Sequence, residues 1–278
     1  MTRRSAGCGK NRKSFSRIRR TGPPRLGYLC PVGTILQTRR GDSPLVAAHR
    51  GASDRALENS IAAIALAVSD RADMIELDVR LSADGQPAVL HDARTGRTAR
   101  EDLTVASTSS ASLRKVILKN GEPLPFLADV LEVVRGTVPI NIHVKTPGGA
   151  AAVCGVLRSA GYTGEAIISS GLREECLAAR SLRPDLPCGL VTGRPSASDI
   201  AFCIRHALPS IHPDYRKLSP LRIGKVKTAG LLLIPYTVDD PETFIRLVDS
   251  GADGVFSNRA ETLRAAWRGR ATAEARDR

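Results

Sequence analysis

Three of the five histidines in the chain stand at the ends of short apolar runs, beside charged side chains. His49 precedes Arg50 at the end of one run, His91 closes a second, and His143 lies two residues before Lys145 in a third. Imidazole titrates near neutral pH and therefore serves as a general acid or base. The pattern indicates a site that moves protons next to fixed positive charge.

Two carboxylates belong to the same set. Glu76 and Asp78 lie two residues apart in "DMIELDV", so a strand places them on one face, and the apolar residues around them indicate a buried strand with the carboxylates turned inward. Inward carboxylates need a cation, and their oxygens bind divalent metal ions. Arg50 and Lys145 can neutralise a phosphate. Together with the histidines, these groups suit metal-assisted hydrolysis of a phosphodiester.

The elements that must position these residues repeat along the chain. From residue 44 onward, short apolar runs alternate with amphipathic helical stretches, which is typical of parallel βαβ units. Strands are expected at 45–49, 73–79, 139–145, 165–170, 187–192, 208–212, 231–237 and 253–257, and helices at 59–69, 126–136, 173–182 and 241–250 among others. Eight units in about 225 residues predict an α/β fold, a (β/α)₈ TIM barrel, with an open doubly wound sheet as the alternative. In a barrel the carboxyl ends of the strands share one face, where catalytic groups collect.

One segment interrupts the alternation. "ELDVRLSADGQPAVLHD" contains Asp84-Gly85, a strong signal for a two-residue hairpin turn. With these two residues at the centre of the turn, His91 lies opposite Asp78 and so beside the carboxylates. Residues 92–125, rich in Ser, Thr and Arg, are expected to form a short inserted loop or lid.

The formal net charge of +13 is located at the N-terminal end. Residues 1–40 contain eleven Lys and Arg and no acid, and removing these from the 41 in the chain leaves 30 against 28 acidic residues. We therefore expect a basic, disordered extension over 1–43, a near-neutral barrel over 44–268 and a disordered tail over 269–278. A near-neutral barrel gives no sign of specific nucleic-acid binding.

No stretch approaches the roughly 20 apolar residues of a membrane-spanning helix, and none is long enough for a secretory signal. The six cysteines show no C-x-x-C pairing, so neither a disulfide framework nor a zinc site is expected. These features predict a protein without a transmembrane segment in a reducing compartment, the cytoplasm.

Four segments resemble, in order and spacing, the glycerophosphodiester phosphodiesterase family. They are "HRGASDRALENS", "ADMIELDVRLSADGQPAVLHD", "INIHVK" and "PYTVDDPETFIRLVDSGADGVFSN", and the resemblance covers residues 44 to about 262. It implies a TIM barrel that hydrolyses small-molecule glycerophosphodiesters to sn-glycerol 3-phosphate and an alcohol, in lipid and glycerol metabolism, with one divalent metal ion.

The resemblance also assigns roles to side chains near the strand ends. They are the acid/base pair His49 and His91, the metal ligands Glu76 and Asp78, the phosphate-facing Arg50 and Lys145, and the substrate-site residues Glu58 and Tyr236.

The chain departs from the family pattern in its third strand. Members usually carry Glu-x-Lys there, with the Glu on the metal, whereas this chain has His143-Val144-Lys145. The resemblance implies Ca²⁺ or Mg²⁺, but imidazole is a poor ligand for both and a good one for Mn²⁺ or Zn²⁺. We therefore expect His143 as a third metal ligand, with a phosphate contact or plain packing as alternatives for it.

Other departures leave the alcohol group of the substrate open. The usual Trp-Thr-Val-Asn reads 236–239 "YTVD", and the closing Thr-Asp reads 257–258 "SN". Lysophospholipase D-like activity is an alternative that requires an apolar mouth near 92–125. A second alternative is a phosphodiester-binding protein that has lost catalysis, because His143 replaces the usual third metal-ligand Glu. The retained pair His49 and His91 argues against this alternative. Nucleic-acid binding through residues 1–40 would show strong salt dependence.

Overall fold

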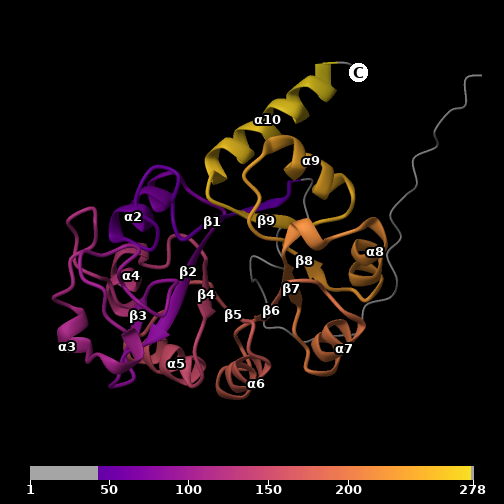
Figure 1. Cartoon of the computed structure of the whole chain (residues 1–278). Helices are drawn as coiled ribbons and strands as arrows, with labels where there is room; N and C mark the ends of the chain where they lie inside the picture. Colours follow the sequence, from indigo (N-terminus) through magenta and orange to yellow (C-terminus); the bar gives the residue numbers. More distant parts are fainter. Residues whose placement is uncertain (1–42, 277–278) are drawn as a thin grey trace, which may run out of the picture.

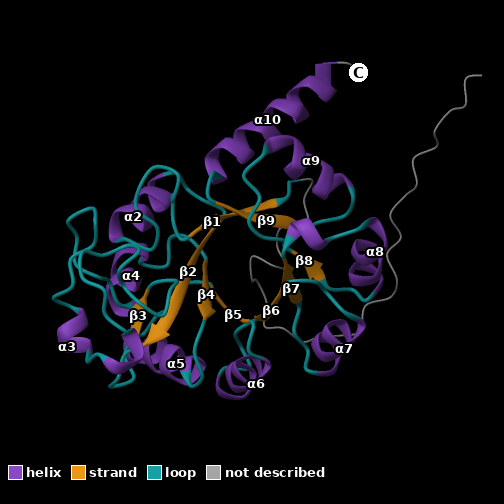
Figure 2. Cartoon of the chain, viewed as in Figure 1, coloured by secondary structure: helices purple, strands orange, loops and turns teal. Residues whose placement is uncertain are grey.

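Eight parallel strands form a ring in the computed structural model, which describes residues 43–276 (Figure 2). They are β1 (Leu45–His49), β2 (Met74–Leu81), β4 (Ile140–Val144), β5 (Ala166–Ser170), β6 (Cys188–Thr192), β7 (Ser210–Pro213), β8 (Leu232–Leu233) and β9 (Gly254–Ser257). Their order is β8-β7-β6-β5-β4-β2-β1-β9. Backbone hydrogen bonds from Asp253 N to Leu233 O and from Phe256 N to Pro235 O join the two ends. The predicted TIM barrel is confirmed.

Helices surround this ring on its outside (Figure 1). They are α2 (Ile61–Ser69), α4 (Leu127–Val134), α5 (Gly149–Ser159), α6 (Arg173–Leu182), α7 (Ala197–Arg205), α8 (Pro220–Thr228), α9 (Pro241–Asp249) and α10 (Ala260–Arg276). Side chains alternate between the two faces of each strand, so every second one faces the helices. In β4 these are Ile140, Ile142 and Val144, which belong to the main core together with apolar side chains of the helices. The residues between them, Asn141 and His143, face the inside of the barrel.

The inside of the barrel is partly apolar and partly polar. A separate buried cluster fills it with Leu45, Ala47, Met74, Ile167, Ile234 and Phe256. Polar side chains are buried on inward positions of β4, β5 and β7, namely Asn141, Ser169, Ser210 and His212. The metal-binding and proton-transfer groups predicted from the sequence lie on other inward positions and at the strand ends.

The hairpin after β2 forms, but with a longer turn than the sequence predicts. Ser82 N donates to Gln86 O at 3.0 Å, which leaves a loop of residues 83–85 between them. Gly85 adopts φ +77° there, the left-handed conformation that closes a three-residue loop.

This longer turn shifts the pairing of β2 with β3 (Pro87–Val89). Val79 lies opposite Val89, whereas the sequence predicts Leu90 as its partner, so the predicted register is wrong by one residue. His91 therefore does not pair opposite Asp78. It follows the end of β3, where its carbonyl accepts a hydrogen bond from Arg80 Nε at 2.7 Å.

The inserted segment after β3 is a packed layer with short helices η1 (Val105–Ser107) and α3 (Ser110–Leu113). Its apolar residues form their own buried cluster with the hairpin: Ala88, Leu90, Ala99, Val105, Leu113, Val116, Leu118, Leu124 and Phe126. Asp84 of the turn accepts hydrogen bonds from the backbone N and the hydroxyl of Ser110, at 2.8 and 2.6 Å. The insert is thereby attached to the hairpin.

The last helix extends further than expected. Residues 269–276 continue α10, which corrects the predicted disordered tail over that range. Arg270 binds Asp249 of α9 at 3.0 Å, which ties α10 to α9 at this point, and it lies over the ring of Trp267 within α10. The predicted extension over 1–43 falls, except for its final residue, outside the described residues. No helix within 43–276 is long and apolar enough to cross a membrane.

Candidate active site

The chain turns sharply where β1 ends at His49. Arg50 and Gly51 both have positive φ, 60° and 82°. A Cβ on Gly51 would lie 2.6 Å from the backbone carbon of Ala63, so only glycine fits there. The turn aims the backbone N–H of Arg50 at Glu76, whose Oε2 accepts it at 3.0 Å. The sequence His-Arg-Gly thus directs the first strand end onto the carboxylates of the second.

Glu76, Asp78 and His143 come together as one buried cluster. Asp78 and His143 are register partners on β2 and β4, and Glu76 lies two residues before Asp78. His143 Nδ1 is 3.6 Å from Glu76 Oε1 and 3.3 Å from Asp78 Oδ1. Glu76 and Asp78 are buried, with only 3% and 1% of each residue's surface exposed. One ligand atom from each of the three residues lies within 4.8 Å of the others, a spacing that could hold a metal ion.

The donor set fits a divalent cation. Asp78 Oδ1 is buried and accepts no well-directed hydrogen bond, although Lys145 Nζ lies 3.1 Å away. Burial alone would raise the pKa of Asp78, but its contacts with His143 and Lys145 outweigh burial and hold that pKa well below its usual value. Asp78 is therefore an anion with a free acceptor direction. Burial likewise opposes the charge on His143, yet Asp78 and Glu76 raise its pKa. A metal ion held here would need the imidazole nitrogen of His143 in its deprotonated form.

Arg50 is held over Asp78 by a second carboxylate. Its Nε lies 3.1 Å from Asp78 Oδ2, and its NH1 donates to Glu58 Oε1 at 2.8 Å. Asn59 fixes Asp78 from the other side: its Nδ2 donates to Asp78 Oδ2 at 3.0 Å, and its Oδ1 accepts from the Asp78 N–H at 3.2 Å. Glu58, a predicted site residue, and its neighbour Asn59 thus both lie at the site.

His49 is oriented by a chain of two further residues. Asn258 Oδ1 lies 2.7 Å from His49 Nδ1, and Asn258 Nδ2 donates to Asp239 Oδ2 at 2.8 Å. Because an amide oxygen only accepts, His49 carries its proton on Nδ1. Its Nε2 faces Glu76, with 3.9 Å to Oε2. His49 therefore presents a nitrogen lone pair to the cluster.

His91 is oriented by its neighbour in sequence. Its Nδ1 is 2.6 Å from Asp92 Oδ1, and Asp92 also accepts a hydrogen bond from Arg97 Nε. Arg97 holds the pKa of Asp92 down at about 2, so Asp92 is anionic and accepts the Nδ1 proton. Burial lowers the pKa of His91 more than Asp92 raises it. At neutral pH His91 is thus uncharged, with Nε2 available.

Comparison with known proteins identifies the family of the chain. Residues 49–262 match the model of the "Glycerophosphoryl diester phosphodiesterase family".

The protein belongs to the glycerophosphoryl diester phosphodiesterase family.

Similar proteins come from several bacteria. A glycerophosphodiester phosphodiesterase of Caldanaerobacter subterraneus subsp. tengcongensis is 30% identical over 232 residues, which cover 79% of this chain and 96% of that one. Among solved structures, a phosphodiesterase of Oleispira antarctica in complex with its product sn-glycerol-3-phosphate has a TM-score of 0.76 and 25% identity, over 80% of this chain and 96% of that one. A glycerophosphodiester phosphodiesterase of Agrobacterium tumefaciens has a TM-score of 0.69 and 27% identity, with 80% and 100% coverage.

His91 is joined to the site only indirectly, through Asp92, Arg97 and Glu58. Tyr236 is the predicted site residue that stands apart. It follows β8, its hydroxyl donates to Thr192 O at 3.3 Å, and its side chain packs against the apolar cluster inside the barrel. Four side chains that orient His49 or His91 in the structure had no such role predicted from the sequence: Asp92, Arg97, Asp239 and Asn258. Asp92 directly follows His91, a predicted acid/base residue, and this is the one signal that would have indicated it. Arg97 and Asp239 reach the site from loops without periodicity.

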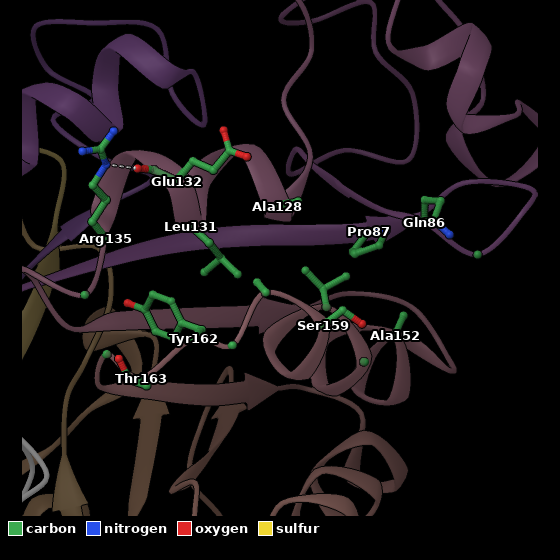
Figure 3. A pocket seen from close by; sticks show the side chains of 17 residues that line it. Gln86, Pro87, Ala128, Leu131, Glu132, Arg135, Ala152, Ser159, Tyr162 and Thr163 are labelled. Carbon is green, nitrogen blue, oxygen red and sulfur yellow. Dashed lines mark hydrogen bonds between the residues drawn. The ribbon is translucent and has the colours of Figure 1, made fainter.

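A groove elsewhere on the molecule lacks the groups for this chemistry. Figure 3 shows it between α4 and α5, where Leu131 and Tyr162 point toward one another. Its volume is about 810 Å³. The residues described there include one acid, Glu132, and one cation, Arg135, and no histidine. The groove is therefore separate from the acid/base cluster at the strand ends.

Proposed function

We propose that the protein hydrolyses glycerophosphodiesters to sn-glycerol 3-phosphate and an alcohol. The observation that carries the proposal is the pair of imidazoles, His49 and His91. Each is held through Nδ1 by a hydrogen-bond acceptor, which leaves its Nε2 free. His49 Nε2 lies 3.9 Å from the buried carboxylate of Glu76, and His91 is linked through Asp92 and Arg97 to Glu58, the partner of Arg50. A protein that only binds a phosphodiester has no use for two histidines prepared in this way. Membership of the family supports the same reaction.

The residues divide the reaction into charge stabilisation and proton transfer. Arg50 and Lys145 both lie 3.1 Å from Asp78 oxygens, so two cations are already gathered where a phosphate would carry its negative charge. One of His49 and His91 takes a proton on Nε2 from the attacking water or hydroxyl group. The other must first bind a proton from solvent on its Nε2, which it then gives to the leaving oxygen. Glu58 holds Arg50 in place, and we assign to it a role in substrate binding through Arg50.

We propose that Glu76, Asp78 and His143 hold one divalent metal ion. A bound ion would polarise a phosphoryl oxygen and add positive charge where it develops in the transition state. With two carboxylates and one imidazole, the donor set favours Mn²⁺ or Zn²⁺ over Ca²⁺ or Mg²⁺.

Direct binding tests this assignment without relying on turnover. Isothermal titration of chelator-stripped protein with Mn²⁺, Zn²⁺, Ca²⁺ and Mg²⁺ should show tighter binding of the first two, and His143→Glu should reverse the preference. Glu132→Gln, on the outer groove, is the matched control and should change no affinity. Unchanged affinities in His143→Glu would remove His143 from the metal site.

The catalytic test uses the same metal-loaded proteins. Release of sn-glycerol 3-phosphate from glycerophosphocholine and glycerophosphoethanolamine should require metal and disappear on chelation. Turnover that needs no metal would contradict the proposal, and so would no release from any glycerophosphodiester in the presence of every metal.

The structure offers little support for lysophospholipase D-like activity. Within 43–276 the large apolar side chains that are exposed are Leu177, Leu182, Ile204 and Leu221. None of them belongs to the insert over 92–125, whose apolar residues pack into their own cluster. An acyl chain would find no apolar mouth there.

We also propose that the barrel with α10, residues 44–276, suffices for catalysis on a small-molecule substrate in the cytoplasm. Residues 1–43 are then a separate basic extension without specific nucleic-acid binding. Deletion of 1–43 should leave turnover within about twofold, since the side chains assigned to the site all belong to residues 49–258. Loss of activity on deletion would contradict this division of the chain.

A further inference from the structure

We infer that Asp239 is a positioning residue that fixes the tautomer of His49 through the side-chain amide of Asn258. The inference rests on the proposed function, because there His49 transfers a proton through Nε2. Asp239 lies in the loop between β8 and α9, and Asn258 follows β9, so both belong to the face where the strands end. Asp239 does not contact the ring of His49 or His91, and it acts on His49 through Asn258.

The carboxylate of Asp239 determines which way the amide of Asn258 points. Asp239 Oδ1 accepts from Asn258 N at 2.8 Å and from Ser257 Oγ at 3.1 Å, and Oδ2 accepts from Asn258 Nδ2 at 2.8 Å. An ionised carboxylate only accepts hydrogen bonds. The amide must therefore present its NH₂ to Asp239, and its oxygen faces the opposite way.

The amide oxygen then determines the state of His49. Asn258 Oδ1 lies 2.7 Å from His49 Nδ1 and also accepts from Ser53 Oγ at 3.1 Å. Ser53 Oγ in turn lies 2.7 Å from the His49 carbonyl, so the serine ties the amide to the same strand end. With Nδ1 bound to hydrogen, a neutral His49 must keep its lone pair on Nε2, on the side of Glu76.

The substitution Asp239→Asn should reverse this chain of hydrogen bonds. The new amide still offers its oxygen to the Asn258 N–H and the Ser257 hydroxyl, which leaves its NH₂ facing the NH₂ of Asn258. Two donors cannot face one another, so the Asn258 amide turns over and presents its NH₂ to His49. Nδ1 must then accept, and the proton of His49 moves to Nε2, where it blocks the lone pair.

The double exchange Asp239→Asn with Asn258→Asp should restore the original order. The carboxylate then stands at position 258, where it accepts from His49 Nδ1, from Ser53 Oγ and from the new amide at position 239. Every donor again faces an acceptor, and His49 again keeps its proton on Nδ1. Rescue by a second substitution distinguishes positioning from a general loss of structure.

The experiment compares four full-length, metal-loaded proteins: wild type, Asp239→Asn, the double exchange and the control Asp240→Asn. Asp240 is the neighbouring carboxylate and caps α9 through Thr243 N at 2.8 Å, a role that asparagine performs equally well. The readouts are kcat and KM for glycerophosphocholine, and the ¹⁵N shifts of the His49 ring, which report the tautomer.

Asp239→Asn should lower kcat about 100-fold with KM within about threefold, because proton transfer by a positioned side chain contributes on this scale. Its ring shifts should change from the Nδ1-H to the Nε2-H form. The double exchange should recover kcat to within about tenfold of wild type, and Asp240→Asn should match wild type in both readouts.

An unchanged tautomer in Asp239→Asn would overturn the inference, and so would a loss of kcat that the double exchange fails to recover. The proposed function is tested separately by the wild type. If the wild type releases no glycerol 3-phosphate, the proposed function fails, while the ring shifts of the four proteins still decide whether Asp239 fixes the tautomer.

Discussion

Acidification from pH 7.5 to 5.5 should cost the protein about 1.4 kcal/mol of stability through one buried side chain, His212. His212 is 2% exposed inside the barrel, where its Nε2 lies 3.0 Å from Ser210 Oγ. Its Nδ1 is buried without a hydrogen-bond partner, and the ring packs edge-on against Phe256. Burial, and secondarily the charge of His143, lower the pKa of His212 to about 3. The folded protein therefore keeps this ring neutral.

The sign and size of the effect follow from proton linkage. The pKa of an unfolded histidine is about 6.5, so below that pH the unfolded chain binds a proton that folded His212 refuses. The unfolded state gains stability as the pH falls, and the free energy of unfolding decreases. At pH 5.5, one unit below the unfolded pKa, the loss is about 1.4 kcal/mol, against almost none at pH 7.5. The loss grows until the pH approaches 3.

Urea denaturation at both pH values measures this loss. His212→Gln keeps a polar group near Ser210, but its side chain does not titrate. For each protein, the change in the free energy of unfolding between the two pH values is measured. Comparing these changes between the two proteins removes the cost of the substitution and the titration of other groups. Wild type should lose about 1.4 kcal/mol more than His212→Gln on acidification. Equal losses in the two proteins would refute the reasoning, as would an NMR titration of wild-type His212 with a pKa above 5.

Two further substitutions test contacts at the site. Arg97→Gln removes the cation that orients Asp92 and should lower kcat at least about tenfold with little change in melting temperature. The control Arg94→Gln removes an exposed ion pair of the same insert and should leave kcat within about twofold. Equal effects of the two substitutions on kcat would show that Arg97 has no special position. Gly51→Ala places a Cβ within 2.6 Å of the Ala63 backbone at a residue with positive φ, and it should lower the free energy of unfolding in urea by about 1–3 kcal/mol. Unchanged stability would show that the turn after His49 is not constrained.

The barrel was predictable because it depends on patterns that neighbouring residues carry. In β4, alternate apolar residues at 140, 142 and 144 determine that His143 faces inward, whatever the rest of the chain does. The register of the hairpin was not predictable in this way. "SADGQ" is compatible with loops of two and three residues, and the choice depends on the backbone conformation around Gly85.

Contacts between distant segments set the other limits of the prediction. His49 and Asn258 are 209 residues apart, and Glu58 and Arg97 are 39 apart, so no local pattern indicates that either pair is joined. The end of α10 illustrates the same point. Its last turns lack an apolar stripe that would predict a helix, and Arg270 contacts Asp249 only because the fold brings α9 and α10 together.

The central claim is that His49 and His91 are a matched acid/base pair in a phosphodiester hydrolase. The most direct measurement is the release of sn-glycerol 3-phosphate from glycerophosphocholine by metal-loaded wild type, His49→Ala, His91→Ala and the control His206→Ala. The ring of His206 lies tilted against Phe202 of α7, away from the site. Wild type and His206→Ala should turn over the substrate, and each of the other two proteins should lose at least about 100-fold in rate. Turnover in His49→Ala or His91→Ala at the wild-type rate would contradict it.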